Sequence, residues 1–443
     1  MRIAFYEDAT AENFSPIALT RPVFELVCGR FSLRERVLKS LNVTEWGVFL
    51  RPHLEETYRE SHLEAHVNDL SWLREAPTLF INGRWLPTQD DLNNLDHDKS
   101  GMIGDTLASF TLDPSDVPLL KEETWDDFLT KAIATQKPKQ GQGILVDYPW
   151  DLINHNATQL SIDFHLCRFA TREWKPGPQV AVMGRREDIF VDPTAAIDPF
   201  VVLDARNGPI SIDAGAQIQS FTRLEGPCHI GRNSQLFRAN VRGATTIGPV
   251  CRVGGEVEAS VLHGYVNKYH DGFLGHSYLC PWVNLGALTT NSDLKNDYSN
   301  VRIPLSGEMI DSEHSKVGCF IGDHTKTAIG SLFNTGSSIG VMCMVLPNGE
   351  LLPKHVPSFS RFRHGDLSEE TDIEKNLQVA RIAMNRRNCE LTASQERLLR
   401  RLYEETRSER ENAVSRFHEK EKKRHQSPVQ KQLEKESLNN SDP

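Results

Sequence analysis

The chain has 443 residues and a formal net charge of -10, a length that suits two or three domains. This acidic balance provides no basic surface of the kind that neutralises nucleic-acid phosphates, so we expect no nucleic-acid partner. The eight cysteines show no C-x-x-C pair and no framework spacing, which argues against a zinc site or a disulfide scaffold. With neither a signal-peptide pattern nor an apolar run long enough to span a bilayer, we expect a cytoplasmic protein without membrane insertion.

The first part of the chain mixes short apolar runs with helical stretches. Residues 3–6, 47–50 and 78–81 have the length of buried strands, and residues 32–41 have a helical pattern. Buried strands that alternate with helices indicate a layered α/β sheet. We therefore predict an α/β domain over residues 1–180.

A six-residue repeat marks the middle of the chain. Side chains of helices and strands repeat every 3.6 and 2.0 residues, so a period of six fits neither. It fits a triangular coil in which one aliphatic side chain per unit points into a narrow prism and a small residue turns the corner. We predict a parallel β-helix over residues 181–360. The repeating positions are Val191, Ile197, Leu203, Ile212, Ile218, Leu224, Ile230, Leu236, Ile247 and Val253, then Ile321, Thr327, Phe333, Ile339 and Val345.

The repeat lapses between residues 263 and 317, and such excursions from a rigid scaffold are where functional residues usually lie. Beyond about Leu367 the composition shifts to Glu, Lys, Arg, Gln and Ser, although leucines still form a helical stripe. We predict an amphipathic α-helix within residues 367–418 and a disordered charged tail over residues 419–443.

Several short segments carry a family resemblance. They are residues 19–22 (LTRP), Gly29, and residues 34–36 (RER), 82–84 (NGR), 148–151 (YPWD), 270–279, 282–287, 291–296 (NSDLKN) and 322–327 (GDHTKT). In these segments the chain resembles bacterial enzymes in which a nucleotidyltransferase domain precedes a hexapeptide-repeat acyltransferase domain. The best known are the bifunctional glucosamine-1-phosphate acetyltransferase/N-acetylglucosamine-1-phosphate uridylyltransferases, and the specific pattern is that of a shorter sugar nucleotidyltransferase branch. The resemblance covers about residues 1–360 and implies that the β-helix is left-handed.

The resemblance also implies an acyltransferase site in the repeat region. The family's catalytic base falls on His270, and its asparagine falls on Asn284. A histidine suits this reaction because an ammonium group must lose a proton before it attacks a thioester, and histidine titrates near neutral pH. Asn284 or backbone N–H groups would then stabilise the thioester oxyanion. The implied donor is acetyl-CoA or another acyl-CoA.

The substrate side of this site departs from the family pattern, so the acceptor sugar is expected to differ. The family's tyrosine is Phe273 here, and its Asn-Tyr-Asp stretch is replaced by residues 291–293. Lysine and arginine side chains nearby are candidates for binding phosphates. The candidate substrate-binding residues are Phe273, His276, Asn291, Asp293, Lys295, Lys326 and Arg21, and no metal ligands are predicted.

Each of these residues also has an alternative interpretation. His270 could be a hydrogen-bonded loop histidine, Asn284 could be one rung of an asparagine ladder, and the lysines could be solvated charges. His263, His270, His276 and His314 could instead gather around zinc, as in a β-helical γ-class carbonic anhydrase, although their spacing fits no recognised ligand pattern.

The first domain lacks two features of nucleotidyltransferases. Their triphosphate lies on a glycine-rich loop after the first strand, but the corresponding residues 6–13 contain no glycine and are acidic. Their magnesium ion is held by an aspartate after a later strand, where this chain has Arg84. Mg²⁺ would be a cofactor only if this domain is active.

We therefore predict a transferase of sugar-nucleotide or cell-envelope precursor metabolism, an acyl-CoA-dependent N-acyltransferase that acts on an amino sugar or its phosphate. The first domain would be a sugar-1-phosphate nucleotidyltransferase, intact or degenerate. Expected substrates are an amino sugar phosphate, an acyl-CoA and, if the first domain is active, a nucleoside triphosphate. The resemblance implies a homotrimer with ligand sites between neighbouring prisms. The rival hypothesis is a non-catalytic sugar-nucleotide-binding sensor or scaffold.

Overall fold

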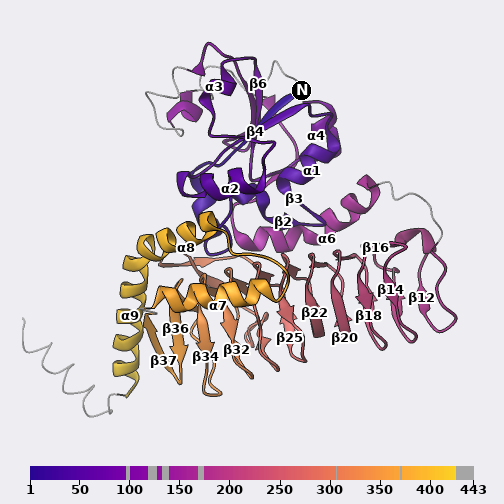
Figure 1. Ribbon diagram of the computed structural model, residues 1–443, viewed down its shortest axis with the longest axis vertical. Coiled ribbons are helices and arrows are strands. Elements are labelled where there is room, and N and C mark those ends of the chain that lie inside the picture. The colour runs from indigo at the N-terminus through magenta and orange to yellow at the C-terminus, as the bar shows by residue number, and fades with distance from the viewer. Residues whose placement is uncertain are drawn as a thin grey trace, which may run out of the picture.

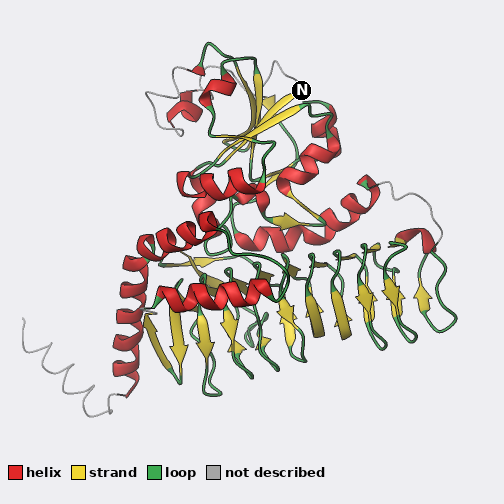
Figure 2. Ribbon diagram, in the orientation of Figure 1, coloured by secondary structure: helices red, strands yellow, loops and turns green. Residues whose placement is uncertain are grey.

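The computed structural model describes residues 1–95, 100–117, 127–131, 139–167, 174–305, 307–369 and 372–425. An α/β domain lies along one side of a long parallel β-helix, and the C-terminal helices pack along another part of its length and over its C-terminal end (Figure 1). The same three parts are distinguished by secondary structure in Figure 2. This arrangement confirms the predicted fold class.

The α/β domain is built on one mixed sheet. Strands β1, β4, β5 and β6 run parallel, whereas β9 is antiparallel to β6 and β8. The parallel strands place their carboxyl ends at one edge, which is where ligands bind in open α/β sheets. Over the described residues the strand order is β10 (Lys139–Gln140), β8 (Gly101–Ile103), β9 (Thr106–Leu112), β6 (Thr78–Asn82), β1 (Arg2–Tyr6), β4 (Glu45–Phe49) and β5 (His66–Val67).

Helices and two small ladders complete the domain. Helix α1 (Leu33–Ser40) begins with a capping box, in which the Ser32 hydroxyl accepts from the Glu35 N–H and the Glu35 carboxylate accepts from the Ser32 N–H. The long helix α6 (Pro149–Leu166) begins with proline, whose missing N–H costs nothing at that position. The remaining elements are α2 (Glu55–Ser61), α3 (Leu70–Leu73), α4 (Gln89–Asn93), β2 (Val27–Cys28) with β3 (Phe31–Ser32), and β7 (Trp85–Leu86) with β11 (Ile144–Leu145).

The β-helix has three faces, each made of short strands stacked in parallel. Face one is β13 (Ile189–Val191), β16 (Ile210–Ile212), β19 (Cys228–Ile230), β21 (Thr245–Ile247), β23 (Val261–Leu262), β26 (Tyr278–Leu279), β30 (Cys319–Ile321), β33 (Ser337–Ile339) and β35 (His355–Val356). Face two is β14 (Ala196–Ile197), β17 (Gln217–Ile218), the first halves of β20 (Gln235–Val241) and β22 (Arg252–Glu258), β24 (Asn267–Lys268), β31 (Lys326–Thr327), β34 (Met344–Leu346) and β36 (Ser360–Arg363). Face three is β12 (Ala181–Met183), β15 (Val202–Asp204), β18 (Arg223–Glu225), the second halves of β20 and β22, β25 (Phe273–Gly275), β27 (Thr290–Asn291) and β32 (Leu332–Phe333).

The repeating aliphatic positions fill the prism. Leu203 pairs with Leu224 on face three, Ile218 with Leu236 on face two, and Ile230 with Ile247 on face one. All six side chains are buried in one apolar cluster that runs along the prism interior. Burial of this kind stabilises the coil by about 25 cal/mol for each Å² of apolar surface removed from water. The six-residue period therefore has the physical cause that the sequence indicates.

One coil is interrupted by a long excursion between β26 and β30. It contains β27 and an antiparallel hairpin of β28 (Arg302–Leu305) and β29 (Glu308–Asp311). Apolar residues of this excursion, Val301, Ile303 and Val317 among them, pack into the cluster that also contains the α/β domain. The excursion is therefore packed against the rest of the chain.

The C-terminal region differs from the single predicted helix. The chain first adds an antiparallel strand, β37 (Asp366–Glu369), and then forms α7 (Ile373–Asn385), α8 (Ala393–Glu405) and α9 (Arg407–His425). A capping box at Thr392 begins α8, which alone contains the helical leucines Leu398, Leu399 and Leu402 of the predicted stripe. The predicted disordered tail is wrong for residues 419–425, which belong to α9, and residues 426–443 lie outside the described residues.

The three parts share one apolar cluster, and an ion pair joins the α/β domain to the β-helix. The cluster combines side chains of the α/β domain with face-one residues such as Tyr278 and Phe320 and with Leu398 and Leu399 of α8. Beside it, Arg21 of the α/β domain forms an ion pair with Asp323, which follows β30. Burial alone would raise the pKa of Asp323, but the Arg21 guanidinium outweighs burial and holds that pKa below its ordinary value.

Removing one partner of this ion pair should loosen the domain junction. In Asp323→Asn the Arg21 guanidinium would stay buried without its counter-charge, a situation that typically costs about 3–5 kcal/mol. We expect a clearly lower melting temperature in calorimetry of the full chain. The control is Glu56→Gln, which breaks an exposed pair with Arg397 between α2 and α8 and should change the melting temperature little. Equal effects of the two variants would contradict this role of the buried pair.

The same pair should make the junction acid-sensitive. Because the folded-state pKa of Asp323 lies below the ordinary value of 3.8, its stabilisation is complete above that pH and is lost as the pH falls through the lower folded value. Melting temperatures measured from pH 6 to pH 3 should therefore converge for wild type and Asp323→Asn at the acid end. A gap that stays constant over this range would exclude the titration of Asp323 as its source.

Candidate functional site

The carboxyl edge of the α/β sheet is closed by ion pairs. Glu7, which follows β1, receives two hydrogen bonds of 3.1 Å from the guanidinium of Arg51, which follows β4. Asp8 receives two bonds of 2.8 and 2.7 Å from Arg84, which follows β6 and is also paired with Asp147. Arg84, which stands at the expected metal position, therefore neutralises the Asp8 carboxylate of the acidic loop.

A cavity of about 310 Å³ remains at this edge, and three of the side chains that line it are acidic. It is lined by Glu7, Asp8 and Glu12, with Arg51 already engaged. A triphosphate in this cavity would meet carboxylates where nucleotidyltransferases present backbone N–H groups. Among the described residues no group of three His, Cys, Asp or Glu side chains could hold a metal ion. Two of the carboxylates at this edge, Glu7 and Asp8, are held by arginines of the same chain.

Four of the predicted substrate residues come together at the corner between faces three and one. His276 follows β25, and its Nδ1 lies 2.8 Å from Oδ2 of Asp293. Both side chains are partly buried, at 17% and 13% exposure, so solvent still reaches the pair. Burial opposes ionisation of Asp293, but the hydrogen bond and charge of His276 hold the pKa of this carboxyl below its ordinary value. The pair has the geometry of an imidazole oriented by a carboxylate.

Gly275 and Asn291 build this corner. A Cβ at Gly275 would lie 2.4 Å from the Phe273 ring and 2.6 Å from Asp293 Oδ2, so only glycine lets both side chains approach here. The buried Asn291 accepts from the Gly275 N–H at 2.8 Å and donates to the Gly275 carbonyl at 3.0 Å. These bonds fix the strand that leads into His276. Asn291 therefore positions the His276–Asp293 pair from inside the fold.

His270 lies at a different corner, between faces two and three. It follows β24, and its side chain is exposed. Asn284 lies on face two, where its Oδ1 accepts a 2.5 Å hydrogen bond from the Asn267 amide of the coil before it. This bond matches the asparagine-ladder interpretation of Asn284. The strand β25 separates His270 from His276, so the structure does not gather the two histidines.

Three basic residues from the prediction have partners within the chain. Lys295 is bonded to Ser299 and to the Asn300 carbonyl, and it pairs with Asp297 at 3.8 Å. Lys326 donates to the His324 carbonyl at 3.1 Å and lines a cavity of about 10 Å³ beneath α7, with room for no more than about one water molecule. Burial lowers the pKa of Lys326 to about 8. Arg21 is the junction residue that pairs with Asp323.

Lys268 is a residue that the sequence reasoning missed. It pairs with Val253 on face two, and its side chain is buried. Its ammonium donates to the carbonyls of Gly254 at 2.7 Å and His270 at 3.0 Å, so it fixes the corner that carries His270. Burial lowers the pKa of Lys268 to about 8. The six-residue phase could not mark it, because the coil from Val253 to Lys268 has 15 residues and steps of six from Val253 fall on Ala259, Tyr265 and Asp271.

Comparison with known proteins gives these sites a context. Residues 3–170 match the family model described as sugar nucleotidyl transferase. A bifunctional sugar-1-phosphate nucleotidylyltransferase/acetyltransferase of Sulfurisphaera tokodaii is 32% identical over 148 residues, which are 32% of this chain and 36% of that protein. The bifunctional protein GlmU of Synechococcus elongatus is 28% identical over 179 residues, 38% of this chain and 36% of the relative. The chain thus spans about a third of the length of these curated relatives.

Among solved structures, a UDP-N-acetylglucosamine acyltransferase aligns with 40% of this chain and 70% of its own, at 16% identity and a TM-score of 0.21. No helix in the described part of the chain is both long and apolar enough to cross a membrane. The chain thus joins an α/β domain that matches the sugar nucleotidyl transferase family model over residues 3–170 to a parallel β-helix, and over about a third of its length it is similar to bifunctional nucleotidyltransferase/acetyltransferase proteins.

Proposed function

We propose that the protein is an acyltransferase that moves an acyl group from an acyl-CoA thioester to the amine of an amino sugar or its phosphate. The observation that carries this proposal is the partly exposed His276–Asp293 pair on the β-helix. A base held by a carboxylate is what deprotonation of an ammonium nucleophile requires. The likeness to a bifunctional nucleotidylyltransferase/acetyltransferase supports the same class of reaction. A place in sugar-nucleotide or cell-envelope precursor metabolism is part of this proposal.

In this mechanism Asp293 accepts a hydrogen bond from Nδ1–H of His276, which leaves Nε2 as the proton acceptor. Nε2 takes a proton from the acceptor ammonium, and the free amine attacks the thioester carbonyl. The C–N bond forms, the nitrogen releases its second proton to solvent, the C–S bond breaks, and the thiolate of coenzyme A leaves with the proton returned by the imidazolium. The Phe273 ring, which packs against Gly275 beside the pair, would form an apolar wall for the substrate.

His270 remains the base that the family resemblance implies. Its corner is fixed by Lys268, but no carboxylate bond to its ring is recorded in the described residues, whereas His276 has Asp293. Geometry therefore favours His276, and the two assignments make different predictions for single variants.

Under this proposal, the first domain keeps its fold but does not catalyse nucleotidyl transfer. The pairs Glu7–Arg51 and Asp8–Arg84 occupy the edge where the triphosphate and its metal would lie. This observation also favours the rival function, a sugar-nucleotide-binding scaffold without turnover. The two functions can be distinguished by an assay of thiol release from acyl-CoA, which only the acyltransferase would catalyse.

Replacement of the base should abolish acyl transfer while the fold persists. We expect His276→Ala to lower the turnover number about 10²–10⁴-fold in a thiol-release assay with acetyl-CoA and a panel of amino sugars and their phosphates. Asp293→Asn should lower it by at least about tenfold, because the imidazole loses its anionic partner. The control is His355→Ala, which removes another histidine–carboxylate pair, with Glu409, and should leave turnover unchanged.

If His270→Ala were inactive and His276→Ala fully active, the base would be His270. Absence of thiol release with every acceptor would reject acyl transfer and favour the scaffold.

The first domain should not form sugar nucleotides. With Mg²⁺, a nucleoside triphosphate and sugar 1-phosphates, we expect pyrophosphate release no faster than in the protein-free control, because carboxylates line the cavity. Arg84→Asp, which places the expected metal ligand at that position, should not restore activity, since Asp8 and Asp147 would then be left unpaired. Pyrophosphate release by the wild-type protein would contradict this degenerate-domain proposal.

The homotrimer implied by the resemblance has a candidate contact surface. Large apolar side chains lie along the corner between faces two and three, and four of them, Phe200, Phe221, Leu288 and Ile329, are more than half exposed. His270 lies at the same corner, so contact between copies there would cover it. Light scattering should give a mass near three times the 50.0 kDa of the chain, and Phe221→Glu should lower it. A wild-type mass of one chain would contradict the trimer.

A further inference from the structure

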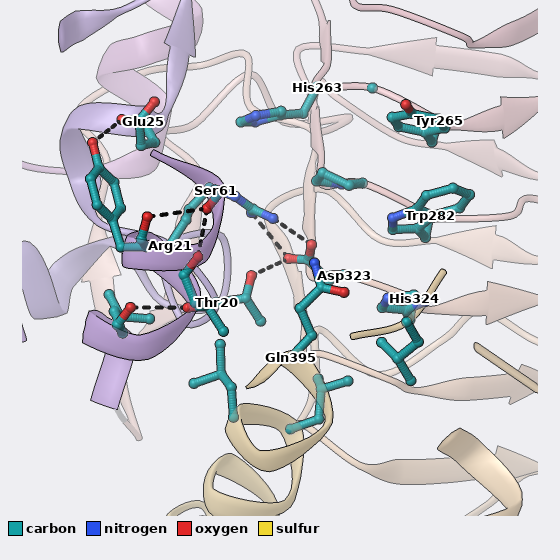
Figure 3. A pocket seen from close by; sticks show the side chains of 18 of the residues that line it. Thr20, Arg21, Glu25, Ser61, His263, Tyr265, Trp282, Asp323, His324 and Gln395 are labelled. Carbon is teal, nitrogen blue, oxygen red and sulfur yellow. Dashed lines mark hydrogen bonds and ion pairs between the residues drawn. The ribbon is translucent and has the colours of Figure 1, made fainter. Parts of the chain in front are cut away.

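A second cavity, of about 400 Å³, lies where all three parts of the chain meet (Figure 3). The α/β domain contributes Arg21 and Tyr58, the β-helix contributes Trp282 and His324, and α7 and α8 contribute Met384 and Leu399. Its volume lies within the range of about 300–1,000 Å³ that is typical of small-molecule sites, which often occur at domain interfaces. This cavity is separate from the His276–Asp293 pair and from the carboxyl edge of the sheet.

The charges in its walls are already compensated. Arg21 is paired with Asp323, which also accepts a 2.7 Å bond from the Thr20 hydroxyl. Glu25 is paired with Arg34 and accepts a 2.7 Å bond from the Tyr58 hydroxyl. An ionic ligand would therefore have to break an existing pair. The cavity suits a ligand, or a part of one, that carries no charge.

One wall is a ladder of flat rings. Tyr265 and Trp282 stack with centroids 4.3 Å apart, and Trp282 and His324 lie nearly parallel at 6.1 Å. They follow β23, β26 and β30 at the same corner of the prism, so successive coils place the rings above one another. In Figure 3 the nitrogen-bearing edges of Trp282 and His324 point toward Arg21 and Asp323 in the middle of the cavity. The wall therefore offers aromatic surface together with hydrogen-bonding edges.

Two buried histidines add neutral hydrogen-bonding groups. Burial lowers the pKa of His263 and of His324 to about 3, so both rings are uncharged at neutral pH. His263 uses Nδ1 for a 3.0 Å bond with the Tyr278 hydroxyl, and Figure 3 shows its ring directed into the cavity. Nδ1 of His324 is buried with no hydrogen-bond partner among the described residues, so the wall has hydrogen-bonding capacity to spare. A neutral imidazole offers one donor and one acceptor.

From these features we propose that the cavity binds an uncharged ligand part built on a flat heteroaromatic ring, of which a nucleobase is the representative. The ring would pack along the Tyr265–Trp282–His324 ladder, as bases do on aromatic side chains. The histidine and indole nitrogens would meet its polar edge, and the leucines of α8 would cover its apolar side. Because three parts of the chain line the cavity, an occupant stabilises their junction. The proposal is independent of acyl transfer.

The test uses the full chain and three kinds of probe. Uridine and adenosine represent nucleosides, uracil and adenine represent free bases, and the 5′-monophosphates add charge. We expect at least one nucleoside to bind in calorimetry and to raise the melting temperature, with its monophosphate binding no more tightly. Trp282→Ala should weaken binding at least tenfold, whereas Trp282→Phe, which keeps a flat ring, should change it less than threefold. The control is Phe237→Ala, which removes a ring from the Phe237–Tyr269 pair elsewhere on the β-helix and should leave binding unchanged.

Intrinsic fluorescence keeps the proposal testable should Trp282→Ala fail to fold. A bound base should quench emission in wild type, and this quenching should be absent in Trp282→Phe although the nucleoside still binds. No binding of any probe at millimolar concentration would overturn the proposal. So would binding that Trp282→Ala leaves unchanged, or a monophosphate that binds much more tightly than its nucleoside.

Discussion

The ion pair between Arg21 and Asp323 leads a set of polar contacts that fix how the α/β domain lies on the β-helix, and Arg30 with Asp213 forms a second such pair. A long parallel coil is nearly uniform along its length, so apolar packing alone would tolerate sliding of the domain from one coil to the next. An ion pair is directional, and its buried partners lose much free energy if they separate. The additional bond from Thr20 to Asp323 engages the neighbouring residue of the same segment. The cavity at the junction and the shared apolar cluster both depend on this register.

The β-helix supplies the complementary property, a rigid frame on which polar groups can be held apart from the core. Its interior is a continuous apolar column, and the side chains that carry chemistry lie at corners and in the excursion after β26. His276 follows β25 at one corner, Asp293 follows β27 at the same corner, and Asn291 binds Gly275 of the strand that leads into His276. A carboxylate that orients an imidazole must be held to within a fraction of an ångström, and stacked strands provide this better than a free loop.

The sequence predicted the parts of the fold that follow from local regularity. The six-residue period located the prism because each inward position must be apolar, and short buried strands located the α/β sheet. Of the three C-terminal helices the leucine stripe marked only α8, which holds Leu398, Leu399 and Leu402, and the start signals at Asp372 and Thr392 were not used to separate α7 from α8. The partners of Arg21, His276 and Lys268 could not be predicted, since each is bonded to residues that pairing of the strands or docking of the domain brings close.

Pairing within the chain gives the arginines of the family motifs a structural role, whatever the activity of the domain. Arg21, Arg34 and Arg36, which belong to the segments that carry the resemblance, pair with Asp323, Glu25 and Asp163, all within this chain. Arg36 and Asp163 are buried together, and they anchor α6 beneath α1. A guanidinium that is required for folding stays in place whether or not a phosphate ever binds to it. Retention of such arginines is thus evidence for the fold of the domain, whereas its chemistry must be judged at the carboxyl edge, where Arg84 stands after β6.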